Sequence, residues 1–319
     1  LNYSNGLENP KRLIGKISDP SRADIQAAVT SAKLFVDATT TLNAPRDLAS
    51  LDTTPRSASV FLTPSGKSSV LLLEDSERKS RLDHLEAQYY RAILNSEWGD
   101  LHLEGHYGGL IVGGGCRDVS AVISNELVQL HGAILARQVR TLSTQPKAHI
   151  RVWNLDDETC AIATHLMPVH NPIIQTMGEW TVVWDEGLRR KLFDERASKL
   201  PSETGGVLLG YFDLKLNTIF IVDTLPAPPD SKADGTGFTR GKVGLNEHIE
   251  KCAKRTAYVV GYVGDWHSHP PHSSAKPSVM DIALLSSLAN GMALDGLPSL
   301  MMIVGEGEIS IMTGSACKK

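Results

Sequence analysis

Two histidines and an aspartate have the types and the spacing of a metal-binding set. His267 and His269 lie two residues apart at the end of a predicted strand. In a strand, residues i and i+2 point to one face, so both imidazoles can reach the same ion. Asp281 follows in the first turn of a predicted helix and can bring a carboxylate to that ion. Two nitrogens and one oxygen, with a fourth position open to water, are the ligand set of a catalytic zinc site.

A glutamate and a serine complete the groups that hydrolysis at such a site needs. Zinc lowers the pKa of a bound water to about 7, and a carboxylate must then carry the water's proton to the leaving amine. Glu203 is the candidate for this general base, because it begins a predicted strand in which Gly205 and Gly206 let another backbone approach closely. Ser278, three residues before Asp281, has a hydroxyl that can hydrogen-bond the developing oxyanion.

Each of these residues also has a plainer interpretation. Two histidines in a strand can be ordinary surface residues, and a complete site can be kept as an inactive scaffold. Both readings are disfavoured because the glutamate, serine and aspartate positions are all filled. Of the neighbours, His272 is interpreted as a loop residue, Trp266 as a side chain packed beneath the site, and Cys252 as a core residue on a helix face.

In this order the residues resemble the JAMM (MPN-plus) metalloprotease family. The family pattern is a distant glutamate, then His-Ser/Thr-His-Pro, then a serine with an aspartate three positions later. Glu203, the segment 267–270, Ser278 and Asp281 match it, and the resemblance covers roughly 180–319. One departure is that eight residues separate His269 from Ser278, where seven is usual. The extra residue falls in a loop rich in proline and serine.

The resemblance implies an α/β (α+β) fold of three layers, similar to that of cytidine deaminases, and a zinc cofactor. Members of the family cut isopeptide or peptide bonds after the C-terminal glycine of ubiquitin or a ubiquitin-like protein. A ubiquitin-like protein and its conjugates are therefore the implied partners. The loop 226–241 lies where such enzymes often carry insertions that contact the substrate, although most loops of this composition are solvated turns.

The elements that position these residues follow from periodicity and from turn residues. Strands and helices alternate through the C-terminal part, which indicates an α/β or α+β domain. Its strands are expected within 179–185, 203–213, 217–228, 257–269 and 298–312, and its helices within 186–201, 245–255 and 277–292. Nearer the N-terminus, helices are expected within 19–42, 76–96 and 118–142, and strands within 68–75, 110–112 and 149–156.

Residues 105–172 resemble the last α/β unit of ThiF-like, ubiquitin-activating-enzyme-like proteins. A turn of glycines at Cys116, a long helix with small residues and the strand at 149–156 carry the resemblance. Bacterial fusions of such a domain with a C-terminal JAMM domain are known. Two domains are therefore expected, a partial or degenerate ThiF-like region over 1–175 and a JAMM/MPN metalloprotease domain over 176–319.

The sequence contains neither a GxGxxG motif after a predicted strand nor a P-loop, so this chain is not expected to bind ATP. Either an adenylating half lies upstream of Leu1, or the N-terminal region is degenerate and binds partners. Cys116 is a candidate thioester nucleophile, because the neighbouring Arg117 would lower its pKa. The alternative is a small residue in a tight turn.

Composition narrows the class of protein further. A length of 319 residues suggests two domains. A formal net charge of −4 gives no electrostatic reason to expect nucleic acid or an anionic membrane as a partner. No apolar stretch approaches the length of a membrane span, and the start of the chain lacks the apolar core of a signal peptide. Four scattered cysteines without a disulfide spacing fit a reducing cytoplasm.

Taken with these observations, the two resemblances imply a cytoplasmic zinc isopeptidase or peptidase that removes or processes a ubiquitin-like modifier in a bacterial conjugation system, such as one used in antiphage defence. A ubiquitin-conjugating-enzyme-like protein is a further expected partner. Three alternatives stay open. They are an activating enzyme with an accessory JAMM domain, a non-catalytic module that binds a modifier, and a peptidase that acts on cell-wall or phage-tail peptides.

Overall fold

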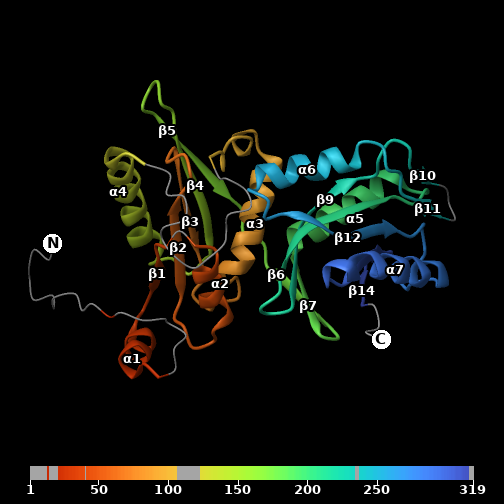
Figure 1. Ribbon diagram of the computed structural model, residues 1–319, viewed down its shortest axis with the longest axis horizontal. Helices are drawn as coiled ribbons and strands as arrows, with labels where there is room; N and C mark the ends of the chain where they lie inside the picture. The colour runs from red at the N-terminus through yellow and green to blue at the C-terminus, as the bar shows by residue number, and fades with distance from the viewer. Residues whose placement is uncertain (1–12, 14–20, 40, 106–122, 234–236, 316–319) are drawn as a thin grey trace, which may run out of the picture.

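A computed structural model of the protein, drawn in Figure 1, describes residues 13, 21–39, 41–105, 123–233 and 237–315. The described strands form a five-stranded sheet, a seven-stranded sheet and a two-stranded hairpin. The five-stranded sheet belongs to the N-terminal half of the chain and the seven-stranded sheet to the C-terminal half (Figure 1). The mixed α/β architecture predicted from the sequence is therefore confirmed.

The N-terminal sheet has the order β1-β2-β3-β4-β5 and is largely antiparallel, with one parallel pair, β1 with β2. Its strands are β1 (Phe35–Asp37), β2 (Ser57–Leu62), β3 (Ser68–Leu73), β4 (His149–Leu155) and β5 (Ile162–Met167). The helices of this half are α1 (Ala23–Ser31), α2 (Asn43–Ser50), α3 (Leu82–Asn95) and α4 (Asn125–Leu142), with a short 3-10 turn η1 (Glu97–Gly99).

The middle strand β3 is buried on both faces. Val70 and Leu72 belong to the core that α3 covers, while Leu71 and Leu73 face Leu142 and the rest of α4. Successive side chains of a strand point to opposite faces, so a strand covered on both sides reads as a continuous apolar run. This explains why the run in 68–75 could be recognised as a buried strand from the sequence.

The C-terminal sheet has the order β14-β13-β12-β8-β9-β7-β6. Its strands are β6 (Pro172–Met177), β7 (Trp180–Asp185), β8 (Gly205–Asp213), β9 (Thr218–Pro226), β12 (Gly261–Ser268), β13 (Ser299–Val304) and β14 (Ile309–Gly314). The hairpin β10 (Lys232–Ala233) and β11 (Phe238–Thr239) follows β9. The helices are α5 (Glu186–Lys199), α6 (Leu245–Arg255) and α7 (Val279–Met292), with a 3-10 turn η2 (Ala293–Asp295).

Helices cover both faces of this sheet and make three layers. Leu188 and Leu192 of α5 pack on one face, with Trp266 of β12 in the same cluster. On the opposite face, α3 and α6 cover the middle of the sheet and α7 covers β13 and β14. Alternate residues of β13 divide accordingly, since Met302 faces the α5 side and Ile303 faces the α7 side.

Helix α3 lies between the two sheets and joins the two halves of the chain (Figure 1). Leu85 and Ile93 of α3 share one hydrophobic core with residues of both sheets. Arg91 of α3 forms a two-pronged ion pair with Asp185, and its Nε donates to the carbonyl of Val222 at 2.8 Å. The two halves are thus packed against each other over an apolar core with buried polar links.

Several sequence expectations need correction or stay open. The helix predicted within 19–42 ends at Ser31, and Phe35 lies instead in β1, because its backbone pairs with Ser57 of β2. The elements α2, β2, β5 and β6 were not predicted, nor was the short hairpin of β10 and β11 inside the loop expected over 226–241. Strand β6 crosses the expected boundary at 175/176 and pairs with β7. The expected strand at 110–112 and the turn at Cys116 fall outside the described residues.

No helix in the described part of the chain is both long and apolar enough to cross a membrane.

Candidate metal centre

The end of β12 meets the start of α7, and this junction brings the predicted ligands together. Strand β12 pairs with β8 and β13 on its two sides, so His267 lies opposite Gly205 and Ile303. Between the two histidines, Ser268 is fully buried, and its hydroxyl accepts a hydrogen bond from the Thr204 amide at 3.0 Å. Because neighbouring side chains alternate, burial of Ser268 on one face turns His267 and His269 toward the other.

Helix α7 begins with a capping box, which is why its first turn has a fixed conformation. The Ser278 hydroxyl accepts a hydrogen bond from the Asp281 amide at 3.2 Å. In return, Oδ2 of Asp281 accepts one from the Ser278 amide at 2.7 Å. The second carboxylate oxygen, Oδ1, remains directed at His267.

The side chains of His267, His269 and Asp281 converge. Nε2 of His267 lies 3.1 Å from Oδ1 of Asp281, and Nε2 of His269 lies 3.7 Å from Oδ2. One ligand atom from each residue lies within 4.8 Å of the others. Two ligands at zinc bond lengths of roughly 2.1 Å stand about 3.4 Å apart at a tetrahedral angle, so the set fits a zinc ion. The side chains are 12–15% exposed, which leaves the site open to solvent.

The ring of His269 is oriented by a backbone carbonyl. Nδ1 of His269 lies 2.7 Å from the carbonyl oxygen of Ser274. A carbonyl only accepts, so Nδ1 carries the proton and Nε2 presents its lone pair to the site. A histidine that binds a metal through one nitrogen ordinarily donates through the other in this way. The arrangement is therefore the one expected of a ligand, not of a surface histidine.

Electrostatics keep the aspartate charged. Burial raises the pKa of Asp281, but hydrogen bonds from His267 and Ser278 outweigh it and hold the pKa well below its usual value. The carboxylate is therefore ionised at neutral pH, which is the form that binds a cation.

Glu203 is buried and lies two residues before the first residue of β8, Gly205, so it precedes the strand that it was expected to begin. The pairing of β8 with β12, continued by the bonds between Thr204 and Ser268, sets Glu203 across from His269. The predicted close approach of backbones is present. A Cβ on Gly205 would lie 2.4 Å from the carbonyl oxygen of Trp266, and 2.5 Å from the Phe238 ring of the β10–β11 hairpin.

The neighbouring residues take the positions that the sequence suggested. Trp266 is fully buried, and its indole nitrogen donates to the Thr224 hydroxyl. The His272 side chain is 90% exposed in the loop after β12. Cys252 is half-buried on α6, against the shared core, and burial raises the pKa of its thiol. Cys116 lies outside the described residues.

Two buried charged residues near the site escaped the sequence analysis. Asp265 precedes His267 by two residues and so shares its face of β12. Burial raises the pKa of Asp265, and Arg240, after β11, opposes this from 3.0 Å. Arg196 on α5 contacts the segment that leaves β12. Arg196 could have been found from the sequence. It lies four residues after Leu192 and eight after Leu188, on the buried face of α5, where a charged side chain is unexpected.

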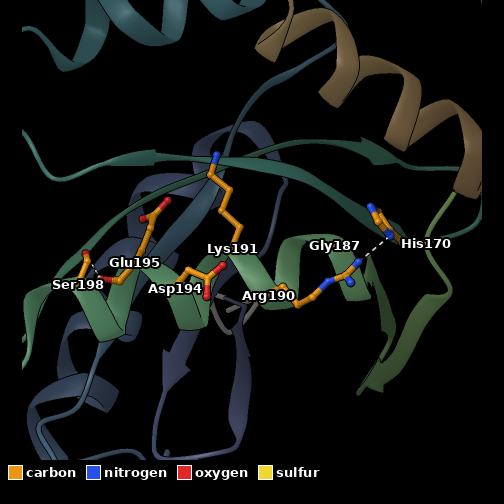
Figure 2. A pocket seen from close by; sticks show the side chains of 7 residues that line it. All are labelled: His170, Gly187, Arg190, Lys191, Asp194, Glu195 and Ser198. Atoms are coloured by element: carbon orange, nitrogen blue, oxygen red, sulfur yellow. Dashed lines mark hydrogen bonds between the residues drawn. The ribbon is translucent and has the colours of Figure 1, made fainter. Parts of the chain in front are cut away.

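A second feature of the C-terminal half is an open pocket of about 630 Å³ beside α5. Figure 2 shows its lining, which consists of His170, Gly187, Arg190, Lys191, Asp194, Glu195 and Ser198. The guanidinium of Arg190 points to Nδ1 of His170 at 2.8 Å, and charges of both signs are present (Figure 2). Within the described ranges, His267, His269 and Asp281 form the group of histidine, cysteine or acidic side chains that could hold a metal ion.

Comparisons with known proteins identify a family for the C-terminal part of the chain. Residues 185–313 match the family of prokaryotic homologs of the JAB domain. A protein of Enterobacter hormaechei subsp. hoffmannii (strain UCI 50), named CD-NTase/cGAS isopeptidase, is 32% identical over 126 residues, which make up 40% of this chain and 68% of that protein. The chain belongs to the JAB family. Its JAB domain includes all five residues that the sequence analysis assigned to the JAMM site.

A solution structure of a protein from Desulfitobacterium hafniense is also similar, with 18% identity and a TM-score of 0.27 over 40% of this chain and 79% of that one. At that score the likeness supports no argument about the fold. The JAMM-type resemblance is confirmed through the JAB domain, whereas the match begins at residue 185 and leaves the ThiF-like resemblance of the N-terminal half a prediction.

Proposed function

We propose that this protein is a zinc-dependent isopeptidase that removes or processes a ubiquitin-like modifier. The observation that carries the proposal is the convergence of His267, His269 and Asp281, with ligand atoms within 4.8 Å of one another. The relative named CD-NTase/cGAS isopeptidase supports the reaction class and suggests the target. We infer that the substrate is a conjugate in which a modifier is joined to a CD-NTase-like protein, in a bacterial antiphage system.

In the proposed mechanism, His267, His269 and Asp281 would hold a zinc ion, which would supply Lewis acidity and make a water at the site more acidic near neutral pH. Glu203 accepts the proton of the attacking water and delivers it to the departing amine. Ser278 stabilises the negative charge that develops on the substrate oxygen. Its Oγ accepts from the Asp281 amide, which leaves the hydroxyl proton to be donated to the substrate.

The proposal extends to the remainder of the chain and its partners. We expected a ThiF-like region, partial or degenerate, over 1–175 and a JAMM/MPN domain over 176–319, and we now propose that the JAMM/MPN domain begins slightly earlier, with β6 at Pro172. The partners are a ubiquitin-like protein, its conjugates and a ubiquitin-conjugating-enzyme-like protein, in the cytoplasm. Cys116 stays a candidate thioester nucleophile. Two alternatives are an accessory role in an activating enzyme and a scaffold without metal. No contact among the described residues favours either of them.

The first experiment is elemental analysis of the purified protein for zinc, with His269→Ala and His272→Ala beside the wild type. We expect about one zinc per chain in the wild type and in His272→Ala, because the exposed His272 is not a ligand. His269→Ala should lose the metal. Absence of zinc from all three proteins, even after zinc is added, would remove the hydrolase proposal.

The second experiment tests the base and the reaction together. Glu203→Gln should abolish cleavage of a ubiquitin-like protein fused at its C-terminal glycine, while zinc content stays at the wild-type level. Glu179→Gln, in the exposed turn between β6 and β7, is the matched control and should cleave normally. Normal cleavage by Glu203→Gln would show that another group acts as the base.

A further inference from the structure

The last turn of α5 carries a buried arginine that faces the metal-binding segment. Arg196 is 7% exposed. Its Nε donates to the carbonyl of His269 at 3.0 Å, and its Nη2 donates to the carbonyl of Pro270 at 2.9 Å. In the part of the chain that the structure describes, its hydrogen bonds go to these two carbonyls and not to a carboxylate.

The position of this arginine in its helix is unusual. Leu188, Leu192 and Arg196 recur every four residues and form the buried stripe of α5. Residues at this spacing lie on one helix face, so packing alone would favour a third apolar side chain. Burial of a guanidinium is unfavourable unless its donors are satisfied. Core packing does not explain an arginine at this position, whereas its hydrogen bonds to the carbonyls of His269 and Pro270 do.

The two carbonyls lie where the chain has left the sheet. Strand β12 ends at Ser268, and the segment that follows contains Pro270 and Pro271, which have no amide hydrogen. Arg196 supplies the hydrogen bonds that a neighbouring strand would otherwise give.

His269 is thereby held at three points. Its amide donates to the carbonyl of Val304 at 2.9 Å, its ring Nδ1 donates to Ser274, and its carbonyl accepts from Arg196. Loss of one contact would let the imidazole move relative to Asp281. Because metal ligands tolerate only small displacements, this would weaken the ion's binding.

We propose that Arg196 is a positioning residue of the metal centre, which fixes the backbone of His269 and Pro270 so that Nε2 of His269 meets the ion. The inference rests on the proposed zinc site. Removing a residue that hydrogen-bonds a metal ligand typically weakens metal binding by about 10- to 100-fold. A similar change is expected here, with the three ligands themselves unaltered.

The test is the zinc dissociation constant, measured by competition with a chromophoric chelator. Arg196→Met keeps a long side chain but removes both donors, and should weaken zinc binding by about 10- to 100-fold. Arg196→Lys keeps the charge with fewer donors and should lie between Met and the wild type. Arg190→Met, on the same helix but directed at His170, is the control and should bind zinc like the wild type.

A second readout separates positioning from general stability. The visible spectrum of the cobalt-substituted protein reports ligand geometry, and it should change in Arg196→Met but not in Arg190→Met. If Arg196→Met does not fold, as judged by circular dichroism, Arg196→Lys provides the comparison. Equal zinc affinity of the folded Arg196 variants and the wild type would overturn the positioning role alone. A wild type that binds no zinc would overturn the proposed function, and the positioning role with it.

Discussion

Ser278 and Asp281 bind each other across the first turn of α7, the Asp281 amide donating to the serine hydroxyl at 3.2 Å and the Ser278 amide donating to the carboxylate at 2.7 Å. The proposed oxyanion donor and a proposed metal ligand are thus parts of one helix cap. The start of the helix fixes where the carboxylate stands. A change at Ser278 can therefore act through the cap or through the reaction, and the two effects need separate tests.

Two substitutions at Ser278 make that separation. Ser278→Ala removes the hydroxyl and the cap, and should cost about 1 kcal/mol of folding free energy. Ser278→Gly also lacks the hydroxyl, but costs only a few tenths of a kcal/mol at an N-cap. If the hydroxyl stabilises the oxyanion, both variants should lose about 10²- to 10³-fold in kcat.

Thermal unfolding and kcat on the same fusion substrate check this prediction, and KM should change little. A glycine variant that cleaves at the wild-type rate, beside an impaired alanine variant, would assign Ser278 to the cap only. Normal turnover in both would remove Ser278 from the mechanism.

Gly205 is expected to be intolerant of a side chain. Its added Cβ would lie 2.4 Å from the backbone oxygen of Trp266, a contact that the strand before His267 must relieve by moving. Overpacking of this kind costs about 1–3 kcal/mol. Gly205→Ala should therefore unfold at lower denaturant concentration and bind zinc more weakly.

Gly132 is the matched control, because a Cβ there would meet nothing within 4 Å and the residue lies inside α4. Gly132→Ala should stabilise the protein by about 0.5–1 kcal/mol. Urea unfolding and chelator competition check the pair. Equal stability of the two variants would contradict the prediction, because it would mean that β8 and β12 can move apart to fit the added methyl group at no cost in folding free energy.

Local sequence patterns predicted part of the site. The close backbone approach at Gly205 and Gly206 was predictable, because two adjacent glycines in a strand indicate a close neighbour whichever strand that neighbour is. The i, i+2 spacing of His267 and His269 predicted their common face for the same reason. The helical prediction for Phe35 was wrong, because Phe35 lies in β1 and pairs with Ser57 of β2, and helical periodicity carries no information about that pairing.

The contacts of α3 and Arg196 could not be predicted for a related reason. Amphipathic spacing identified α3 as a helix, but not that its partners include β7 and β9 of the other half. Arg196 contacts His269 across 73 positions of the chain. Sequence spacing predicts which residues lie on one face of a helix or strand. It does not predict which other element packs against that face.

The shared core predicts that the JAB domain depends on the N-terminal half. A fragment of 168–319 keeps every strand of the second sheet but loses α3. It would expose the apolar surface around Leu209, Tyr211 and Phe220, which α3 covers in the full chain. It would also leave Asp185 without Arg91.

We expect the fragment to unfold at a lower temperature than the full chain, to bind a hydrophobic dye and to self-associate. Differential scanning calorimetry and size-exclusion chromatography check this. The control is a full chain with Lys79→Ala, which removes an exposed ion pair with Glu77 and should unfold like the wild type. A monomeric fragment as stable as the full chain would show two independent domains.

His102 should make the stability depend on pH. Its side chain is 4% exposed, a hydrogen bond of 2.8 Å joins its Nε2 to the Tyr89 hydroxyl, and its ring packs edge-on against Trp98. Burial, and secondarily the charge of His165, lower the pKa of His102 from 6.5 to about 4. The unfolded chain therefore binds a proton at His102 below pH 6.5, while the folded chain does so only below about pH 4.

Between these values the unfolded state holds more protons, so the free energy of unfolding falls as the pH falls, by up to about 3 kcal/mol in total. Urea unfolding from pH 7.5 to 4.5 should show this loss in the wild type and in the control His272→Gln, whose histidine is exposed. His102→Gln should show a smaller loss. The other histidines with lowered pKa values are present in all three proteins, so the difference reports His102 together with its coupling to His165. Parallel pH profiles for His102→Gln and the wild type would mean that His102 is charged or solvated in the folded protein.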